Sequence, residues 1–384
     1  MSGPKLDKEL WGGAAAFDAL LADIRARRSE FADQHFVSAD IIDRFREIGI
    51  YRAFVPRAFG GGERSPTEFL VAIEAISEAD GSAGWVASFG VCEAYLGGLP
   101  LESVHETWSD PDAVFAGAMF PLQKAEVVDG KYLLNGRWRW ASGCTSADRI
   151  GVGIVPNEEG ALPRMAVMPA SQVQIDTGSW DMHGMAGTGS FDIVVEDVLV
   201  DPEWTFVRGA PLTPDGPFFR YPTITIAAQV LAVTSIGVAR EAMNIVRSAG
   251  KPDGALSATG APNIGDREYI QIEMAKAEAR LRSARLFFYD SIDTAWDKLV
   301  KGQELDIETR NMMRLSCTHV TRECAAVVDA AYSVSGMAAA ENSNHLSRCF
   351  RDVHLPTQHA FMGEMTLKNA GAVFFGREPE RGYI

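Results

Sequence analysis

Cysteine and histidine are scarce in this sequence, and several class-defining features are missing from it. Its 384 residues include seven histidines and five cysteines, and no two cysteines form a Cys-x-x-Cys pair. Scattered cysteines in odd number are typical of reduced core residues, so we expect neither a metal site nor a disulfide framework. No run of about 18 apolar residues occurs, and the start "MSGPKLDKELWGG" lacks the apolar core of a signal peptide. These absences predict a cytoplasmic protein without a membrane-spanning helix.

An excess of basic charge is also lacking. Lysine and arginine number 36 against 51 aspartates and glutamates, a formal net charge of −15. Because a protein that binds a nucleic-acid backbone needs a basic face, we do not expect a nucleic-acid partner. We find no internal repeat of about 20–50 residues. A chain of 384 residues exceeds what one hydrophobic core usually organises, so we expect two or three domains.

The first part of the chain has the pattern of helices. The stretch "AAAFDALLADIRARRSEF" carries apolar residues at helical spacing, and "SADIIDRFREIGIYRAF" opens on Ser38 and Asp40, both of capping type. A glycine-rich loop then leads to a further helix with Ser65 and Pro66 at its entrance. Residues 1–112 are therefore predicted to form an N-terminal helical domain.

The pattern changes to strands in the middle of the chain. The stretch "AEVVDGKYLLNGRWRWAS" alternates, with Asp129 and Gly130 as a turn between two runs. Trp138 and Trp140 are two residues apart, which predicts that they share one face of a strand. Further short strand-like runs follow, so residues 113–207 are predicted to form a central β domain.

After a linker rich in proline and glycine, the chain is predicted to be helical again over residues 208–384. One long stretch carries an apolar stripe, and a second long amphipathic stretch and an apolar one (223–247) accompany it. This combination suggests a four-helix bundle and makes the whole an α+β chain. The stripe consists of Ile270, Met274, Ala277, Leu281, Phe288 and Ile292.

Three segments in this order resemble motifs of the acyl-CoA dehydrogenase superfamily, and the resemblance covers essentially the whole chain. They are "GKYLLNGRWRWASGCTSADRIGVGIV" (130–155), "GSWDMHGMAGTGSFDIVVEDVLVDP" (178–202) and "CFRDVHLPTQHAF" (349–361). The similarity is greater to one branch, the flavin-dependent monooxygenases that receive reduced flavin from a separate reductase. It implies the acyl-CoA dehydrogenase-like fold, with an N-terminal helical domain, a central β domain and a C-terminal four-helix bundle.

Departures from the family's motifs favour this branch. Dehydrogenases of the family place a catalytic glutamate at one of two positions, and alanines, Ala228 and Ala360, stand at both here. Proton abstraction from a thioester needs a carboxylate within hydrogen-bond reach, so that reaction loses its base. The family's arginine motif for flavin diphosphate is also missing, and Ala186 stands where the branch usually carries arginine. These differences favour flavin that arrives reduced and leaves oxidised.

The resemblance therefore implies an oxygenase component of a two-component enzyme. It would hydroxylate a small aromatic substrate, phenolic or indolic, through a flavin C4a-hydroperoxide, with dioxygen as co-substrate. Reduced FMN or FAD would come by diffusion from a flavin reductase, and the family is typically homotetrameric. Two alternatives stay open: an acyl-CoA dehydrogenase that uses FAD and an unrecognised base, and a catalytically silent family member that acts as a binding or assembly partner.

His359 and Ser142 are the predicted catalytic residues. An imidazole with a pKa near 6.5 exchanges protons near neutrality, so His359 suits activation of an aromatic ring or a hydrogen bond to the hydroperoxide. A surface or capping histidine after Pro356 is the alternative, and we interpret His354 as structural. The hydroxyl of Ser142 suits a hydrogen bond to flavin N5 or to the peroxide, whereas the Ser-Gly pair without the resemblance indicates a turn.

Further residues are expected to contact flavin or substrate. Ser335 and Gly336 resemble an element that reaches flavin from a neighbouring subunit, and a β-turn is the alternative for the polar cluster at 188–190. Core packing is the alternative for the aromatic residues. The predicted flavin-binding residues are Trp140, Ser142, Gly143, Thr188, Gly189, Ser190, Ser335 and Gly336. The predicted substrate-binding residues are Trp85, Phe89, Met119 and Phe120.

Overall fold

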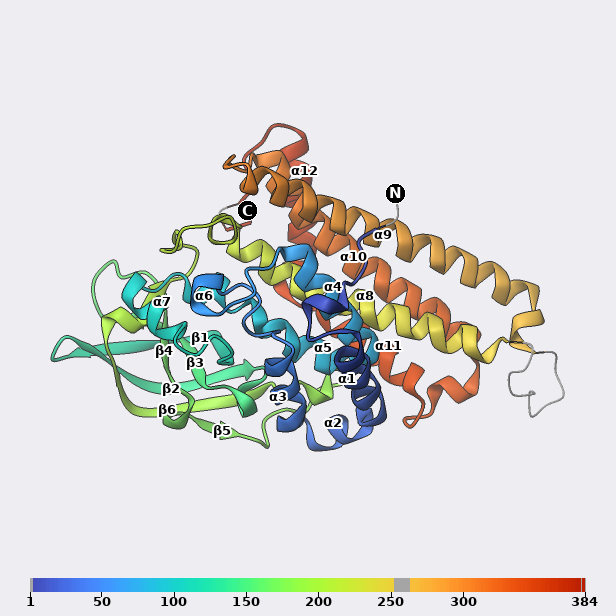
Figure 1. Ribbon diagram of the computed structural model, residues 1–384, viewed down its shortest axis with the longest axis horizontal. Coiled ribbons are helices and arrows are strands. Elements are labelled where there is room, and N and C mark those ends of the chain that lie inside the picture. The colour runs from blue at the N-terminus through green and yellow to red at the C-terminus, as the bar shows by residue number, and fades with distance from the viewer. Residues whose placement is uncertain (1–2, 252–262, 381, 384) are drawn as a thin grey trace.

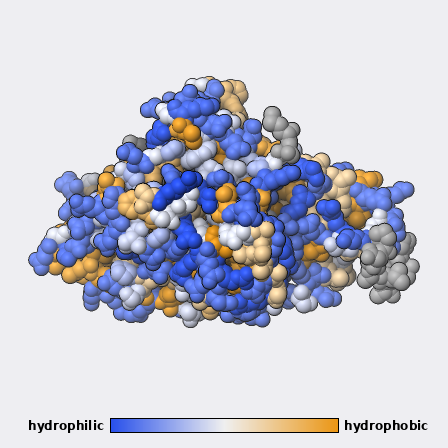
Figure 2. All heavy atoms as spheres, viewed as in Figure 1, coloured by the Kyte–Doolittle hydropathy of each residue, from blue (hydrophilic) through white to orange (hydrophobic). Residues whose placement is uncertain are grey.

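The computed structural model describes residues 3–251, 263–380, 382 and 383. N-terminal helices, a central sheet and long C-terminal helices follow one another along the chain, which confirms the predicted fold (Figure 1). In the view of Figure 1 the sheet lies at one end of the molecule and the long helices at the other, with the N-terminal helices between them. The face shown in Figure 2 is mostly hydrophilic, with apolar residues in small groups.

The N-terminal helices begin where the sequence predicts capping residues. Ser65 caps the helix of residues 66–79 in a reciprocal capping box with Glu68, as the Ser-Pro entrance predicts. Ser38 also precedes a helix, but its hydroxyl donates to Glu30 and makes no capping bond. The helices are α1 (Ala14–Ala26), α2 (Arg28–Gln34), α3 (Ala39–Glu47), α4 (Pro66–Ala79), α5 (Gly81–Ala87), α6 (Glu93–Leu96) and α7 (Leu101–Thr107).

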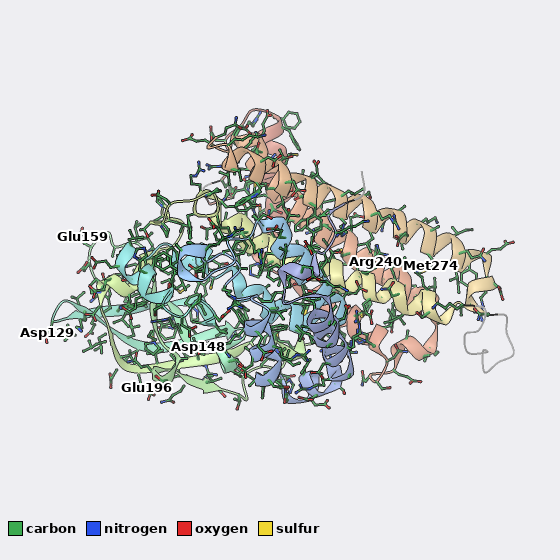
Figure 3. The ribbon with its side chains drawn as sticks, viewed as in Figure 1. Asp129, Asp148, Glu159, Glu196, Arg240 and Met274 are labelled. Carbon is green, nitrogen blue, oxygen red and sulfur yellow. The ribbon has the colours of Figure 1, made fainter. Side chains whose placement is uncertain are left out.

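The described strands form one sheet in the order β5-β6-β2-β1-β3-β4-β7. β1 and β2 are joined by Asp129 and Gly130, whose φ angles of 50° and 79° fit the predicted turn. Asp129 marks the far tip of this hairpin in Figure 3. Our proposed domain division at residues 112 and 207 encloses these strands. They are β1 (Phe115–Val128), β2 (Lys131–Ala141), β3 (Arg149–Pro156), β4 (Arg164–Pro169), β5 (Gln174–Asp176), β6 (Phe191–Val200) and β7 (Thr205–Val207).

Trp138 and Trp140 do not share a face, contrary to the prediction from their spacing. Trp138 is fully buried, whereas Trp140 is 52% exposed. The register between β2 and β6 shifts between Trp138 and Ala141, and Trp140 has a φ angle of 64°. Such a bulge breaks the alternation of side chains and redirects one of them. Trp140 is therefore turned out of the sheet core, where a ligand can reach its ring.

Among its described residues, the C-terminal part contains three long α-helices and two shorter ones. The predicted stripe on α9 faces the core: Met274 is half-buried and the other five residues are buried. An ion pair of 2.6 Å between Arg240 and Glu278 joins α8 to α9, and Figure 3 labels Arg240 and Met274 on these adjacent helices. The helices are α8 (Thr223–Ala249), α9 (Glu268–Val300), α10 (Ile307–Val334), α11 (His345–Thr357) and α12 (Glu364–Phe374).

Helix α8 is the central helix of the core. By length and composition alone it is apolar enough to cross a membrane, but 83% of its most apolar window is buried inside the protein. It packs tightly against α4 at Gly237. A Cβ atom there would lie 2.5 Å from the Cβ of Ser77 and 2.6 Å from the carbonyl oxygen of Glu74. The packing of α8 on α4 therefore requires a residue without a side chain at this position.

We predict that Gly237→Ala lowers the free energy of unfolding by about 1–3 kcal/mol, because the added methyl group overpacks two helix backbones. The matched control is Gly371→Ala on α12, where an added Cβ meets no atom within 4 Å. That change is expected to stabilise the helix by about 0.5–1 kcal/mol. Thermal unfolding of both variants measures the difference, and equal midpoints would contradict the packing argument.

Candidate active site

Two segments far apart in sequence form one polar surface at the end of β2. The turn after β2 approaches the loop before β6, and the backbone N–H of Gly143 donates to the carbonyl oxygen of Thr188 at 2.9 Å. Gly143 and Gly189 have φ angles of 72° and 58°, in the left-handed region that favours glycine. The structure thus brings together six of the predicted flavin-binding residues. They are Trp140, Ser142, Gly143, Thr188, Gly189 and Ser190.

Three buried hydroxyl groups in this surface form a chain of hydrogen bonds with a fixed direction. The hydroxyl of Thr188 donates to the carbonyl oxygen of Met185 at 2.8 Å, and a carbonyl only accepts. The oxygen of Thr188 therefore accepts from Ser190 at 2.7 Å, and Ser190 accepts from Ser142 at 2.5 Å. Since the proton of Ser142 points to Ser190, the lone pairs of Ser142 are free to accept a hydrogen bond.

A buried ion-pair network holds the 185–190 loop, in which the chain of hydrogen bonds ends. Asp352 of α11 accepts from the backbone N–H of Met185 at 2.5 Å. Arg348, one turn earlier, forms an ion pair of 2.8 Å with Asp80, which itself caps α5 by accepting from Ala83. The second ion pair of Arg348, with Asp352, spans 3.5 Å. The network therefore fixes α5, α11 and the 185–190 loop relative to one another.

His359 lies just after α11, at the start of a short 3-10 helix (Ala360–Met362). The residue as a whole is exposed, but surrounding protein atoms bury much of its ring. Its burial, together with the positive charges of Arg208 and Arg314, lowers the pKa of His359 to about 4. Nδ1 accepts from the backbone N–H of Phe361 at 3.2 Å. A neutral imidazole that accepts at Nδ1 carries its proton on Nε2, so His359 presents an N–H donor at that atom.

Sequence reasoning missed the two arginines beside His359. The guanidinium carbons of Arg208 and Arg314 lie 5.9 and 5.4 Å from the ring centre of Phe361, which itself lies 4.6 Å from the His359 ring. Arg208 was hidden in a segment interpreted as a linker. Arg314 had a usable signal, because it lies one turn before the buried Cys317 on α10 and therefore on the buried face of that helix.

The remaining predicted site residues differ in how far they are exposed. Trp85 and Phe89 are half-buried, and a Cβ on Gly143 would lie 3.6 Å from the Phe89 ring. Met119 is half-buried, whereas Phe120 is 59% exposed. Ser335 is half-buried and Gly336 is exposed just after α10, and the hydroxyl of Ser335 donates to the carbonyl oxygen of Ala331 within that helix at 2.7 Å. His354 pairs with Asp329 at 3.0 Å, in keeping with a structural role.

Two hollows on the described surface lie elsewhere. One of about 520 Å³ lies between the middle of β1 and the end of β3, and one of about 320 Å³ between α9, α10 and α12. None of the predicted site residues lines either hollow. Within the described residues, no group of three or more histidine, cysteine, aspartate or glutamate side chains is arranged to hold a metal ion.

Known proteins resemble the chain over nearly its full length. Family models described as acyl-CoA dehydrogenase, N-terminal domain, and acyl-CoA dehydrogenase, C-terminal domain, match residues 14–98 and 229–364. Indole-3-acetate monooxygenase of Pseudomonas putida is 50% identical over 374 residues, covering 96% of this chain and 95% of that protein. The enzyme of the same name from Acinetobacter baumannii is 48% identical, with coverage of 97% and 96%.

A solved structure matches the fold closely. The crystal structure of 3-HSA hydroxylase from Rhodococcus sp. RHA1 has a TM-score of 0.88 and 27% sequence identity, covering 96% of this chain and 98% of that one. The flavin-dependent monooxygenase oxygenase subunit HsaA of Rhodococcus jostii is 28% identical over 96% of this chain and 95% of its own length. The solved hydroxylase shares the fold, and the subunit HsaA is described as part of a flavin-dependent monooxygenase.

We predict that the imidazole of His359 stays neutral until the pH falls to about 4. Between about pH 6.5 and 4 the unfolded chain binds a proton that the folded protein excludes, so this residue's contribution to stability falls as the pH drops through that window. Titration of the histidine Cε1–H signals by NMR, with His359→Gln to assign the resonance, measures the pKa. Arg208→Gln should raise it by removing a nearby positive charge. A pKa near 6.5 in the folded protein would contradict the described surroundings.

Proposed function

The chain belongs to the acyl-CoA dehydrogenase superfamily, within its flavin-dependent monooxygenases, and from this premise we propose that it hydroxylates an indole with a short acidic side chain. It is the oxygenase component of such an enzyme and depends on reduced flavin. The observation that carries the substrate proposal is the 50% identity, over 96% of the chain, to an indole-3-acetate monooxygenase. In the proposed reaction one oxygen atom of dioxygen enters a C–H bond of the indole and the other leaves as water. Reduced flavin supplies the two electrons and two protons and leaves oxidised.

The donor set of the polar surface suits reduced flavin. Trp140, half-exposed on its bulge, offers an aromatic face, and Arg139 covers that ring at 4.6 Å. Ser142 offers an acceptor, because its own proton is held by Ser190. We assign Ser142 to accept from the N5–H of the reduced flavin ring. Because only the reduced ring carries that proton, Ser142 would bind reduced flavin more tightly than oxidised flavin.

His359 is assigned as a hydrogen-bond donor at the reacting centre. The Nδ1 atom is occupied by the N–H of Phe361, and the neutral ring keeps its proton on Nε2. In the proposed role His359 offers this proton to substrate or dioxygen, rather than removing one from the substrate. Of the two roles that the sequence left open, the tautomer supports the donor.

Thioester dehydrogenation, the alternative function, lacks a suitable base. Ala228 is fully buried and Ala360 is exposed, and neither position supplies a carboxylate. Burial raises the pKa of Glu93 on α6 to about 7, which makes it the best remaining candidate among the described residues. Its two oxygens are engaged by the indole N–H of Trp108 at 2.6 Å and by the thiol of Cys92 at 3.7 Å. Glu93 is therefore bonded inside the helical core rather than presented to a substrate.

An oxygenase component works with a reductase, and we propose that flavin passes between the two by diffusion. We further propose a homotetramer in the cytoplasm. Large apolar side chains left exposed on the single chain support assembly: Met337 is 85%, Phe374 63% and Phe375 83% exposed. The five cysteines are free and buried, which supports a reducing compartment.

We predict that the purified chain, given reduced FMN or FAD and dioxygen, converts indole-3-acetate to a hydroxylated product containing one oxygen atom from isotopically labelled dioxygen. Mass spectrometry of the product measures the incorporation. An acyl-CoA added without oxygen to the chain and oxidised FAD is expected to leave the flavin absorbance unchanged. Flavin oxidation that yields only hydrogen peroxide with indolic and phenolic compounds, or bleaching by the acyl-CoA, would overturn the proposal.

Replacement of His359 by alanine is expected to lower the hydroxylated product formed per flavin oxidised by about 10- to 100-fold, the effect of one lost hydrogen bond at a reacting centre. The fold should survive, because the side chain bonds only to a local backbone N–H. His359→Gln restores a donor and should recover part of the yield, which a histidine acting as a base would not permit. The control is His354→Ala on α11, whose partner is Asp329. An unchanged yield in His359→Ala removes this residue from the reaction.

A further inference from the structure

Arg208 and Arg314 carry positive charges that no carboxylate among the described residues neutralises. Neither forms an ion pair in the described structure, although both lie within 6 Å of the Phe361 ring centre. Arg314 is 2% exposed, and its Nη1 atom is buried without a hydrogen-bond partner. A buried charge without a counterion is costly, so an unpaired guanidinium here is an unusual feature that needs an explanation.

The position of Arg314 is fixed rather than adaptable. Its Nε donates to the carbonyl oxygen of Tyr383 at 3.2 Å, and its Nη2 donates to that of Phe361 at 3.3 Å. Thr318 on the next turn of α10 also donates to the Phe361 carbonyl, at 3.3 Å. The charge is thus held over the Phe361 ring, where it adds a constant positive potential.

Of the two arginines, Arg208 is the one more accessible to a ligand. It follows β7 in a loop, is half-buried, and makes no side-chain hydrogen bond within the described structure. Its charge acts on His359, beyond α11, and on Tyr95, which lies on α6. Arg208 therefore stands between these two elements, beside the imidazole that we assign to the reacting centre.

We propose that Arg208 binds the carboxylate of the aromatic substrate, with Arg314 as a fixed second charge over the Phe361 ring. This inference rests on the proposed function, and it names the residues that select an acidic substrate. A guanidinium holds a carboxylate through charge-assisted, bidentate hydrogen bonds. Phe361 supplies an aromatic surface beside the charge, so an aryl acid matches both parts of this site. A neutral indole matches the aromatic part alone.

The test compares two ligands that share the indole ring: indole-3-acetate and 3-methylindole, which lacks the carboxylate. Binding is measured by calorimetry and by thermal stabilisation, with anaerobic reduced FMN present and absent. Arg208→Gln is expected to weaken indole-3-acetate about 10- to 100-fold, the effect of losing a charged hydrogen bond, and to leave 3-methylindole within about twofold. Arg208→Lys keeps the positive charge but cannot form the bidentate hydrogen bonds. Its affinity for indole-3-acetate should lie between those of the wild type and Arg208→Gln.

The matched control removes the same charge one turn away from the site. Arg310→Gln on α10 changes an exposed arginine and should leave both affinities unchanged. Arg314→Lys tests the fixed charge and should weaken only the acid. If it does not fold, the Arg208 variants still decide the question.

Three results would overturn the inference. They are equal losses of affinity for both ligands, no loss of affinity for either, and a loss of affinity for FMN without a loss for riboflavin. The last result would assign the arginines to the flavin phosphate. If the wild-type enzyme hydroxylates indoles but the Arg208 variants keep their preference for the acid, this inference alone fails. If it hydroxylates no indole, the proposed function fails as well.

Discussion

The buried contact of Arg348 with Asp80 and Asp352 is the constraint on which the active-site geometry depends. Taking such charges out of water is costly, and loss of one partner in a buried pair typically costs about 3–5 kcal/mol. Arg348 and Asp352 lie on α11 and Asp80 caps α5, so the contact joins a C-terminal helix to an N-terminal helix. Because Asp352 also accepts from the Met185 backbone, the same network positions the loop before β6.

From that loop the constraint passes to the hydroxyl groups. The carbonyl oxygen of Met185 fixes the direction of the hydrogen bonds through Thr188 and Ser190, and that direction leaves Ser142 as an acceptor. If a hydrogen-bond donor stood in place of the Met185 carbonyl, the direction of these hydrogen bonds would reverse and Ser142 would present a proton. The preference for reduced flavin that we propose is therefore a consequence of where one carbonyl group lies.

The part of the proposed centre around His359 carries positive charge. Desolvation of its ring, together with the positive charges of Arg208 and Arg314 near Phe361, lowers the pKa of His359 and keeps it neutral, with its proton on Nε2. Together with the alanines at 228 and 360, this arrangement removes the negative base that a dehydrogenase needs and leaves donors in its place. The same scaffold can thus be adapted to oxygenation by a small number of side chains, without a change of fold.

The sequence by itself determined the features that depend on neighbours in the chain. The capping box at Ser65, the turn at Asp129 and Gly130, and the stripe on α9 follow from local spacing, and the structure contains all three. The motif order also sufficed for the family, and it singled out Ser142 and His359. These signals are short-range, so a linear pattern carries them.

Only the tertiary structure decided the polarity and charge of the site. The bulge that turns Trp140 outward depends on the register with β6, and the free lone pairs of Ser142 depend on a carbonyl more than forty residues away in the 185–190 loop. The alternation rule therefore misplaced Trp140. The sequence marks Arg314 as a charge on a buried helix face, but the absence of a carboxylate beside it emerges only when α10, the loop after β7 and the segment after α11 pack together. Hydrogen-bond direction and local charge balance depend on all the groups that lie nearby in space. A pattern in the sequence does not show which groups those are.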